Sequence, residues 1–452
     1  MVGGLAPLLL VVLAALALRR WRSASLSGAE RWVLAPAVGL GGSSLLFFWW
    51  RVAGLPPGAL AVPLLALALL LAAASGGVPS GRRAPRSSRW SVDRWALALA
   101  IGVALVVCVL RLLQQPLGEY DAVAIWNARA LTIWRAAEPM GALFFRQTLS
   151  QAHPDYPLLL PGSVAASFAV GGGETVLVPQ VTSVLFLFAA AAAIWLGVHR
   201  VAGAPAARWA AALFLVTPEV LFWGPAQCAD LPLAYLLVLT ALGLARELES
   251  DRGPAARAAL TGFSLGLLPW TKNEGLLLAA LLLAAWLATG LLSRALEPRR
   301  LAALGAGALP GIATLTAFKI LWSPHAELPD FLRGALARSL DPERWRVVLG
   351  SLAGELDPFG AGDEWSLTAL ALLVLGGVGW ATHRGADPPR LFLRLALGGS
   401  LLLWLAVYVG TPADLRWHLS TSLDRLLLQI LPLAFLWAFS ENPPAQLSSA
   451  RA

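Results

Sequence analysis

Long apolar runs recur along the whole chain, and each is closed by a cluster of Arg, Gly or Pro residues. A helix that crosses a bilayer needs about 20 mostly apolar residues, and most of these runs approach that length. The pattern therefore predicts an all-α fold, a polytopic transmembrane helical protein with about 13 transmembrane helices. The predicted helices cover residues 4–18, 32–50, 59–74, 95–113, 176–198, 208–223, 230–246, 256–271, 275–292, 301–322, 366–382, 391–410 and 424–440.

Two long stretches, 114–175 and 323–365, contain amphipathic segments instead of spans. We predict that these segments are juxtamembrane helices, which lie on the membrane surface. The predicted division of the chain is N-terminal transmembrane helices at 1–113, an outer catalytic loop with juxtamembrane helices at 114–175, transmembrane helices at 176–322, a second outer loop at 323–365, and C-terminal transmembrane helices with a short tail at 366–452.

Composition agrees with this pattern. Hydrophobic residues make up 58% of the 452 residues and charged residues 13%, whereas a soluble domain has about 25% charged residues. Two cysteines, Cys108 and Cys228, exclude a disulfide framework or a cysteine metal site. The first apolar run lacks a positively charged start and a cleavage site, so we interpret it as a retained first helix.

The net charge of +8 comes largely from arginines in alternate short loops. Such loops face the cytoplasm, which places the N-terminus outside and the C-terminus inside. The other short loops carry only Arg51, Lys272, Arg416 and Arg425. The arginine-rich loops contain Arg19, Arg20, Arg22 and Arg31; Arg82, Arg83, Arg86, Arg89 and Arg94; Arg200 and Arg208; Arg246, Arg252 and Arg257; Arg294, Arg299 and Arg300; and Arg384, Arg390 and Arg394.

The segment 154–170 is apolar, but counting it as a span would move the later arginine-rich loops outside. It is also interrupted by Pro154, Pro157 and Pro161. We therefore keep it on the outer side, as a surface or partly re-entrant helix, because irregular backbone at membrane depth must be buried in protein or line a cavity.

Five polar clusters then fall on the predicted outer side. An ionisable group near the hydrocarbon boundary is costly and marks function by default, so we predict one polar cavity that opens outward. The clusters are Gly118–Asp121, His153–Pro157, Gln227–Pro232, Trp270–Gly275, and Thr411–His418 together with Asp424 and Arg425.

Simpler explanations stay open for most of these residues. Asp121 and Asp230 stand where a helix-capping carboxylate would stand, and Glu119 has the position of a solvated loop acid. His153 and Asp155 fit a proline-turn pair, and the last cluster fits an interfacial belt. Lys272 is one of only two lysines and lies two residues from Glu274, which predicts a salt bridge or an anion site.

The stretch Glu119-Tyr120-Asp121 resembles the acidic motif in the first large outer loop of the GT-C superfamily of polytopic glycosyltransferases. His153-Pro154-Asp155-Tyr156-Pro157 is similar to their His-Pro-Pro-Leu type element. Cys228-Ala229-Asp230-Leu231-Pro232-Leu233 is similar to a later segment with an Asp at the outer end of a helix. The resemblance covers about residues 115–435 and is greatest to the ArnT-, PMT- and Rgt-like bacterial members.

This resemblance implies an enzyme of the bacterial inner (cell) membrane. It would move a sugar from a polyprenyl-phosphate-linked donor to a glycan, lipid or protein acceptor at the extracytoplasmic face. In an inverting single displacement, Asp121 would take the acceptor proton, with Glu119 as the second carboxylate. The donor phosphate needs positive charge, for which the candidates are Lys272, Arg416, Arg425 and Arg129. The candidate substrate-binding residues are His153, Asp155, Tyr156, Asp230, Glu274 and His418.

No nucleotide-binding Gly-rich loop is apparent, because Gly171–Gly173 lacks a preceding strand and a following Lys-Ser/Thr. This agrees with a lipid-linked donor, and no cofactor is expected. A divalent metal held by Asp121, Glu119, His153 and Asp155 stays an alternative. Membrane lipids are expected partners and nucleic acid is not. Two other functions stay open, a surface-polysaccharide polymerase or ligase and a transporter or flippase.

Overall fold

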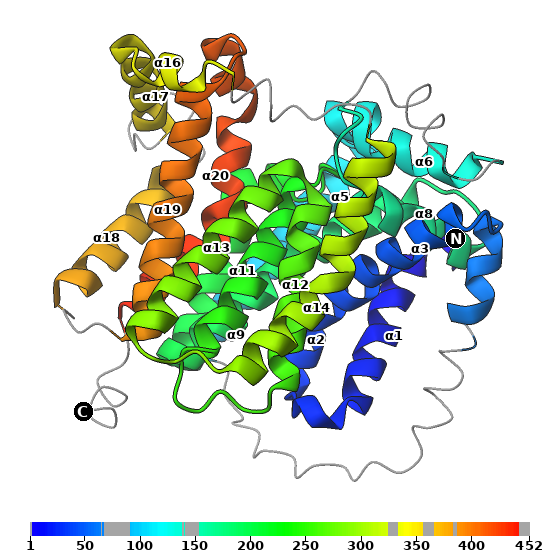
Figure 1. The fold of residues 1–452 in the computed structure, drawn as a ribbon, viewed down its shortest axis with the longest axis horizontal. Coiled ribbons are helices and arrows are strands. Elements are labelled where there is room, and N and C mark those ends of the chain that lie inside the picture. Colours follow the sequence, from blue (N-terminus) through cyan, green and yellow to red (C-terminus); the bar gives the residue numbers. More distant parts are fainter. Residues whose placement is uncertain are drawn as a thin grey trace.

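The computed structural model describes residues 2–64, 66, 91–137, 140, 153–323, 333–355, 366–382 and 387–442, and within these ranges the regular elements are all helical (Figure 1). By length and composition, eight of the described helices can cross a membrane. The predicted all-α, polytopic fold is confirmed, and the protein is an integral membrane protein. The eight helices are Gly3–Arg20, Gly28–Val52, Val92–Gln114, Leu177–Val216, Asn273–Leu292, Pro298–Trp322, Pro388–Gly410 and Leu415–Ser440.

Three other predicted spans are helices of 16 or 17 residues, α11 (Asp230–Arg246), α12 (Ala256–Thr271) and α18 (Ser366–Thr382). They pack beside the longer helices. The predicted span 59–74 lies outside the described residues except for 59–64 and 66, and so do the arginines at 82–89.

The two spans predicted at 176–198 and 208–223 are both helical. They lie within the element α9 (Leu177–Val216), where the non-helical Gly203, with φ 84° and ψ 176°, separates two helices at a kink. The end of the second span needs a correction. The helix stops before residue 223 because Pro218 cannot continue it. A separate short helix, α10 (Pro218–Trp223), follows.

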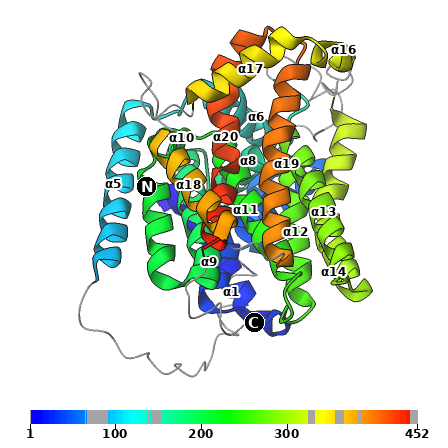
Figure 2. The same ribbon diagram turned by 90° about the vertical axis from the view of Figure 1, so that its left-hand side faces the viewer.

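The helix α11 is the centre of the bundle. Every side chain from Asp230 to Ala241 is buried, and α11 packs against α9, α12 and α20 (Leu415–Ser440). Figures 1 and 2 show it enclosed by these helices. A helix that is apolar on all sides suits such a place, so the one acid at its start needs a special explanation.

The outer segment after α5 (Val92–Gln114) contains η5 (Ala122–Trp126), α6 (Asn127–Arg135) and α8 (Leu159–Gly171). In α8, every side chain from Leu159 to Ala169 is buried. It packs on α6 and on α3 (Gly42–Val52). The prediction of a surface helix is therefore wrong for α8, because other parts of the protein cover it. Small residues allow the close approach, since a Cβ on Gly162 would lie 2.4 Å from Ser44 Oγ.

The described arginine-rich loops gather at one end of the bundle, as the charge pattern predicts. Ion pairs join them to one another: Arg246 and Arg257 with Glu30, Arg200 with Glu249, Arg300 with Glu247, and Arg394 with Glu441. The short helices α16 (Ala335–Ser339) and α17 (Pro342–Glu355) lie at the opposite end (Figure 2).

The helices α12 and α14 (Pro298–Ala317) touch backbone to backbone through glycines. A Cβ on Gly262 would lie 1.9 Å from Leu304 O, and one on Gly307 would lie 1.9 Å from Ala259 O. Small residues of this kind let membrane helices pack closely. Since α12 ends at Thr271, directly before Lys272, this packing also restricts the position of that lysine.

We predict that Gly307→Ala lowers the melting temperature of the detergent-solubilised protein, because the added methyl group meets the backbone of α12. Overpacking of this kind costs about 1–3 kcal/mol. The matched control is Gly305→Ala on the same helix, where a Cβ meets nothing within 4 Å. The control should keep or slightly raise the melting temperature. Equal melting temperatures for the two variants would contradict this packing.

Candidate functional site

Two loops at the end opposite the arginine-rich loops are hydrogen-bonded to each other. The Glu119 amide donates to Ala226 O at 3.2 Å, and Asn127 Nδ2 donates to Gln227 Oε1 at 2.8 Å. Gly118 has φ +82°, and a Cβ there would lie 2.6 Å from Ala226 O. Glycine is therefore required for this contact. The contact brings the start of η5, where Asp121 lies, next to the start of α11.

Asp230 at the start of α11 is only 1% exposed. Its Oδ1 accepts hydrogen bonds from Lys272 Nζ at 3.0 Å and Gln429 Nε2 at 2.8 Å. Its Oδ2 accepts from Arg425 Nε at 3.1 Å and Nη2 at 2.9 Å. Side-chain donors thus occupy both carboxylate oxygens. Capping of α11 alone therefore does not explain why an acid is buried at this position. A helix N-terminus adds further favourable potential for the negative charge.

Arg425 connects Asp230 to Asp121. Its Nη1 donates to Asp121 Oδ2 at 2.6 Å, while its other nitrogens bind Asp230. The guanidinium lies over the Trp223 ring, 5.1 Å from the centroid, and Trp223 Nε1 donates to Asp424 Oδ2 at 3.0 Å. Gln429 follows Arg425 by four residues on α20, so both side chains reach Asp230 from one helix face.

Lys272 reaches the same carboxylate from the junction of α12 and α13 (Asn273–Leu292). It is the single extended residue between the helices, with φ −150° and ψ 163°. Its Nζ lies 3.0 Å from Asp230 Oδ1 and 2.9 Å from Glu274 Oε1. Five charged residues therefore form one continuous group, which we call the Asp230 network: Asp121, Arg425, Asp230, Lys272 and Glu274.

A second polar group is joined to this network through Asn273, which lies between Lys272 and Glu274 in the sequence. Asp155 is 2% exposed, and its Oδ2 accepts from Asn273 Nδ2 at 2.7 Å. Lys319 Nζ donates to Asp155 O at 2.5 Å and to Asn273 Oδ1 at 2.9 Å. Asp155 Oδ1 is buried and has no hydrogen-bond partner among the described residues. The outer turn at 153–156 is thereby tied to the helix junction that carries Lys272.

Arg129 holds the same turn from α6. It is 1% exposed and donates to the carbonyl oxygens of Tyr156, at 3.0 Å, and His153. Burial lowers the pKa of Arg129 to about 10, although Asp155 opposes this effect. The Tyr156 ring stacks between His153 and Trp126, with centroids 4.6 and 5.7 Å away. In the structure, Arg129 orders the turn that presents Asp155.

The remaining predicted site residues lie apart from the network. Glu119 pairs with Arg111 Nη2 at 2.5 Å. The last helix begins at Leu415, capped by Asp414, and not at residue 424 as predicted. Arg416 is therefore exposed in the first turn of α20, about 14 Å along the helix from Arg425. His418 Nδ1 lies 3.0 Å from Thr411 Oγ1.

Three contributing residues are missing from the predicted site set: Asn273, Lys319 and Gln429. Each carries a weak signal in the sequence. Lys319 is the second of the two lysines, and Gln429 is an amide within an apolar run. Within the described ranges, no three His, Cys, Asp or Glu side chains are grouped so that they could hold a metal ion.

Comparison with known proteins gives a distant structural likeness. A scan against protein-family models returns no match, and neither does a search of curated proteins. A search of solved structures matches ArnT from Cupriavidus metallidurans bound to undecaprenyl phosphate. The identity is 13%, the TM-score is 0.41, and the match covers 78% of this chain and 77% of that chain. A likeness this distant does not assign a family, so we base the function on the side chains.

We predict that Asp230→Asn lowers the free energy of unfolding by about 3 kcal/mol, because it leaves the buried Lys272 and Arg425 without their shared counter-charge. Thermal denaturation of the purified protein measures this. The control is Glu174→Gln, which breaks an exposed pair with Arg135 and should cost less than about 1 kcal/mol. Similar losses in the two variants would show that the Asp230 network does not stabilise the bundle.

Proposed function

We propose that this protein is an integral-membrane glycosyltransferase that moves a sugar from a polyprenyl-phosphate-linked donor to an acceptor hydroxyl at the extracytoplasmic face. One observation carries the proposal. Asp121 is 26% exposed and anchored through Arg425 to the buried Asp230–Lys272 pair. The order of the acidic motifs, which resembles the GT-C superfamily, supports the reaction class.

Asp121 is the best candidate for the general base. Arg425 binds its Oδ2, and no described residue donates a hydrogen bond to its Oδ1. A carboxylate that is held at one oxygen and open at the other is suited to take a proton from a bound hydroxyl. Asp230 is unsuited as a base, because it is buried and each of its carboxylate oxygens already accepts two hydrogen bonds. Glu119 is paired with Arg111.

In the proposed displacement, the acceptor oxygen forms a bond to the anomeric carbon as its proton passes to Asp121. The bond between that carbon and the donor phosphate oxygen breaks, the polyprenyl phosphate leaves with the electron pair, and the configuration inverts. The charge that develops on the leaving phosphate needs a cation. Arg425 is the cation in contact with Asp121. Arg111 and the exposed Arg416 offer further positive charge on this side of the molecule.

We predict that Asp121→Asn lowers transfer by about 10²–10⁴-fold, the usual contribution of a general base. Transfer is measured in membranes with radiolabelled sugars on polyprenyl phosphate, using monosaccharide and oligosaccharide donors in parallel. Glu174→Gln, an exposed acid in the same outer segment, is the control and should keep wild-type transfer. Wild-type transfer by Asp121→Asn would contradict the proposal. Exclusive use of oligosaccharide donors would favour a polymerase or ligase.

The proposal also requires that the Asp230 network faces outside the cytoplasm. Cys108 and Cys228 are buried, so introduced cysteines can be labelled on a low background. In intact cells, a membrane-impermeant maleimide should label Arg416→Cys and should label Arg299→Cys only after lysis. Both arginines are exposed, at opposite ends of the bundle. Labelling of Arg299→Cys alone in intact cells would reverse the orientation.

A further inference from the structure

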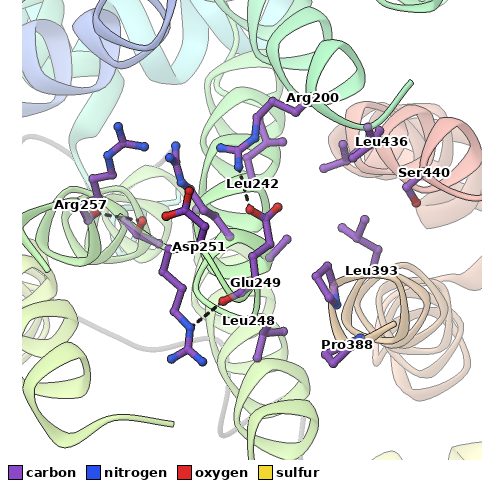
Figure 3. Close-up of a pocket in the computed structure, with 18 of the residues that line it drawn as sticks. Arg200, Leu242, Leu248, Glu249, Asp251, Arg257, Pro388, Leu393, Leu436 and Ser440 are labelled. Carbon is purple, nitrogen blue, oxygen red and sulfur yellow. Dashed lines mark hydrogen bonds and ion pairs between the residues drawn. The ribbon is translucent and has the colours of Figure 1, made fainter. Parts of the chain in front are cut away.

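A cavity of about 1060 Å³ lies at the arginine-rich end of the bundle (Figure 3). It is distinct from the Asp230 network, because Asp230 and Arg246 stand at opposite ends of α11, about 24 Å apart. Its walls come from α9 and α12, the last turns of α11 and α20, the start of α19 (Pro388–Gly410), and the loops beside them. Binding sites for small molecules have volumes of a similar order.

The charged side of this cavity has an excess of cations. Six arginines and four carboxylates line it, which leaves two positive charges. Most of the arginines are engaged: Arg200 Nη2 lies 2.9 Å from Glu249 Oε2, and Arg252 Nη1 donates to Ala295 O at 2.6 Å. Arg294 and Arg390 also line the cavity, and neither guanidinium has a hydrogen-bond or ion-pair partner among the described residues. These two guanidinium groups are therefore available to an anionic ligand.

The opposite side of the cavity is apolar. Leu393 on α19 and Leu436 on α20 face Leu242 of α11 and Leu248 in the turn after it across the gap, as Figure 3 shows. Asp251 lines the charged side and also has no partner among the described residues. A ligand that fills this space must combine an anionic group, hydrogen-bond donors and apolar chains.

We propose that the cavity binds the headgroup of an anionic phospholipid from the leaflet at the arginine-rich end. Arg294 and Arg390 would bind the phosphodiester by charge-assisted hydrogen bonds. Asp251 would accept hydrogen bonds from a glycerol headgroup, and the start of the acyl chains would lie on the leucines. Basic pockets between transmembrane helices, at the level where lipid phosphates lie, are suited to such headgroups. A free phosphate would leave the apolar side of the cavity unused.

The test uses the purified full-length protein in detergent, with lipid binding followed by native mass spectrometry and by melting temperature. Phosphatidylglycerol should be retained and should raise the melting temperature, while phosphatidylcholine and inorganic phosphate at equal concentration should not. The double variant Arg294→Ala/Arg390→Ala should bind phosphatidylglycerol at least tenfold more weakly. The control Arg299→Ala, an exposed arginine at the same end that does not line the cavity, should bind like the wild type.

Wild-type affinity in the double variant would overturn the proposal, and so would equal stabilisation by inorganic phosphate. A second measurement on the unaltered protein covers the case of a poorly folded variant. A photoreactive phosphatidylglycerol should form adducts with the segments that line the cavity, at 196–201, 239–252, 257–264, 293–295, 387–393 or 436–440. Adducts confined to other helices would place the lipid elsewhere and reject this site.

Discussion

The architecture depends on one buried charge. Asp230 begins the most enclosed helix of the bundle, and a carboxylate there is tolerated only when it is paired and fully hydrogen-bonded. Its donors come from two other places, the junction of α12 with α13 and one face of α20. Satisfying Asp230 therefore fixes α20 and Lys272 against α11. The glycine contacts between α12 and α14 hold α12 in place, and Lys272 directly follows α12.

The ion pair between Asp230 and Arg425 also connects the buried network to the proposed reaction centre. Arg425 binds the buried Asp230 with two nitrogens and the partly exposed Asp121 with a third. The buried pair thus sets the position of the arginine, and the arginine sets the position of the base. On the other side, Asn273 ties Lys272 to the turn that contains Asp155. Outer loops that are distant in sequence are held to a rigid helical frame, as a catalytic constellation requires.

Much of the helical frame could be predicted from the sequence, because polar or proline residues end the apolar runs. The bounds of α11 and α12 agree with the predicted 230–246 and 256–271. The partners of the polar side chains were harder to predict than the bounds of the helices. The partnership of Lys319 with Asp155 depends on how α14 packs, and a single sequence does not encode that directly. The sequence places Arg416 and Arg425 in one polar cluster, yet a continuous helix from Leu415 separates them along its axis. The burial of α8 depends on the close contact of its Gly162 with Ser44, on a helix that is distant in sequence.

The balance of cations and carboxylates differs between the two ends of α11, and this difference bears on the mechanism. At the arginine-rich end, cations outnumber carboxylates and two guanidinium groups remain available. In the Asp230 network, two cations face three carboxylates, so the cations are fully engaged. A donor phosphate that approaches Arg425 must therefore compete with Asp121 for the Nη1 hydrogen bond. Under the proposed mechanism, donor binding would draw Arg425 toward the phosphate, while Asp121, whose Oδ1 is already open, accepts the proton of the acceptor hydroxyl.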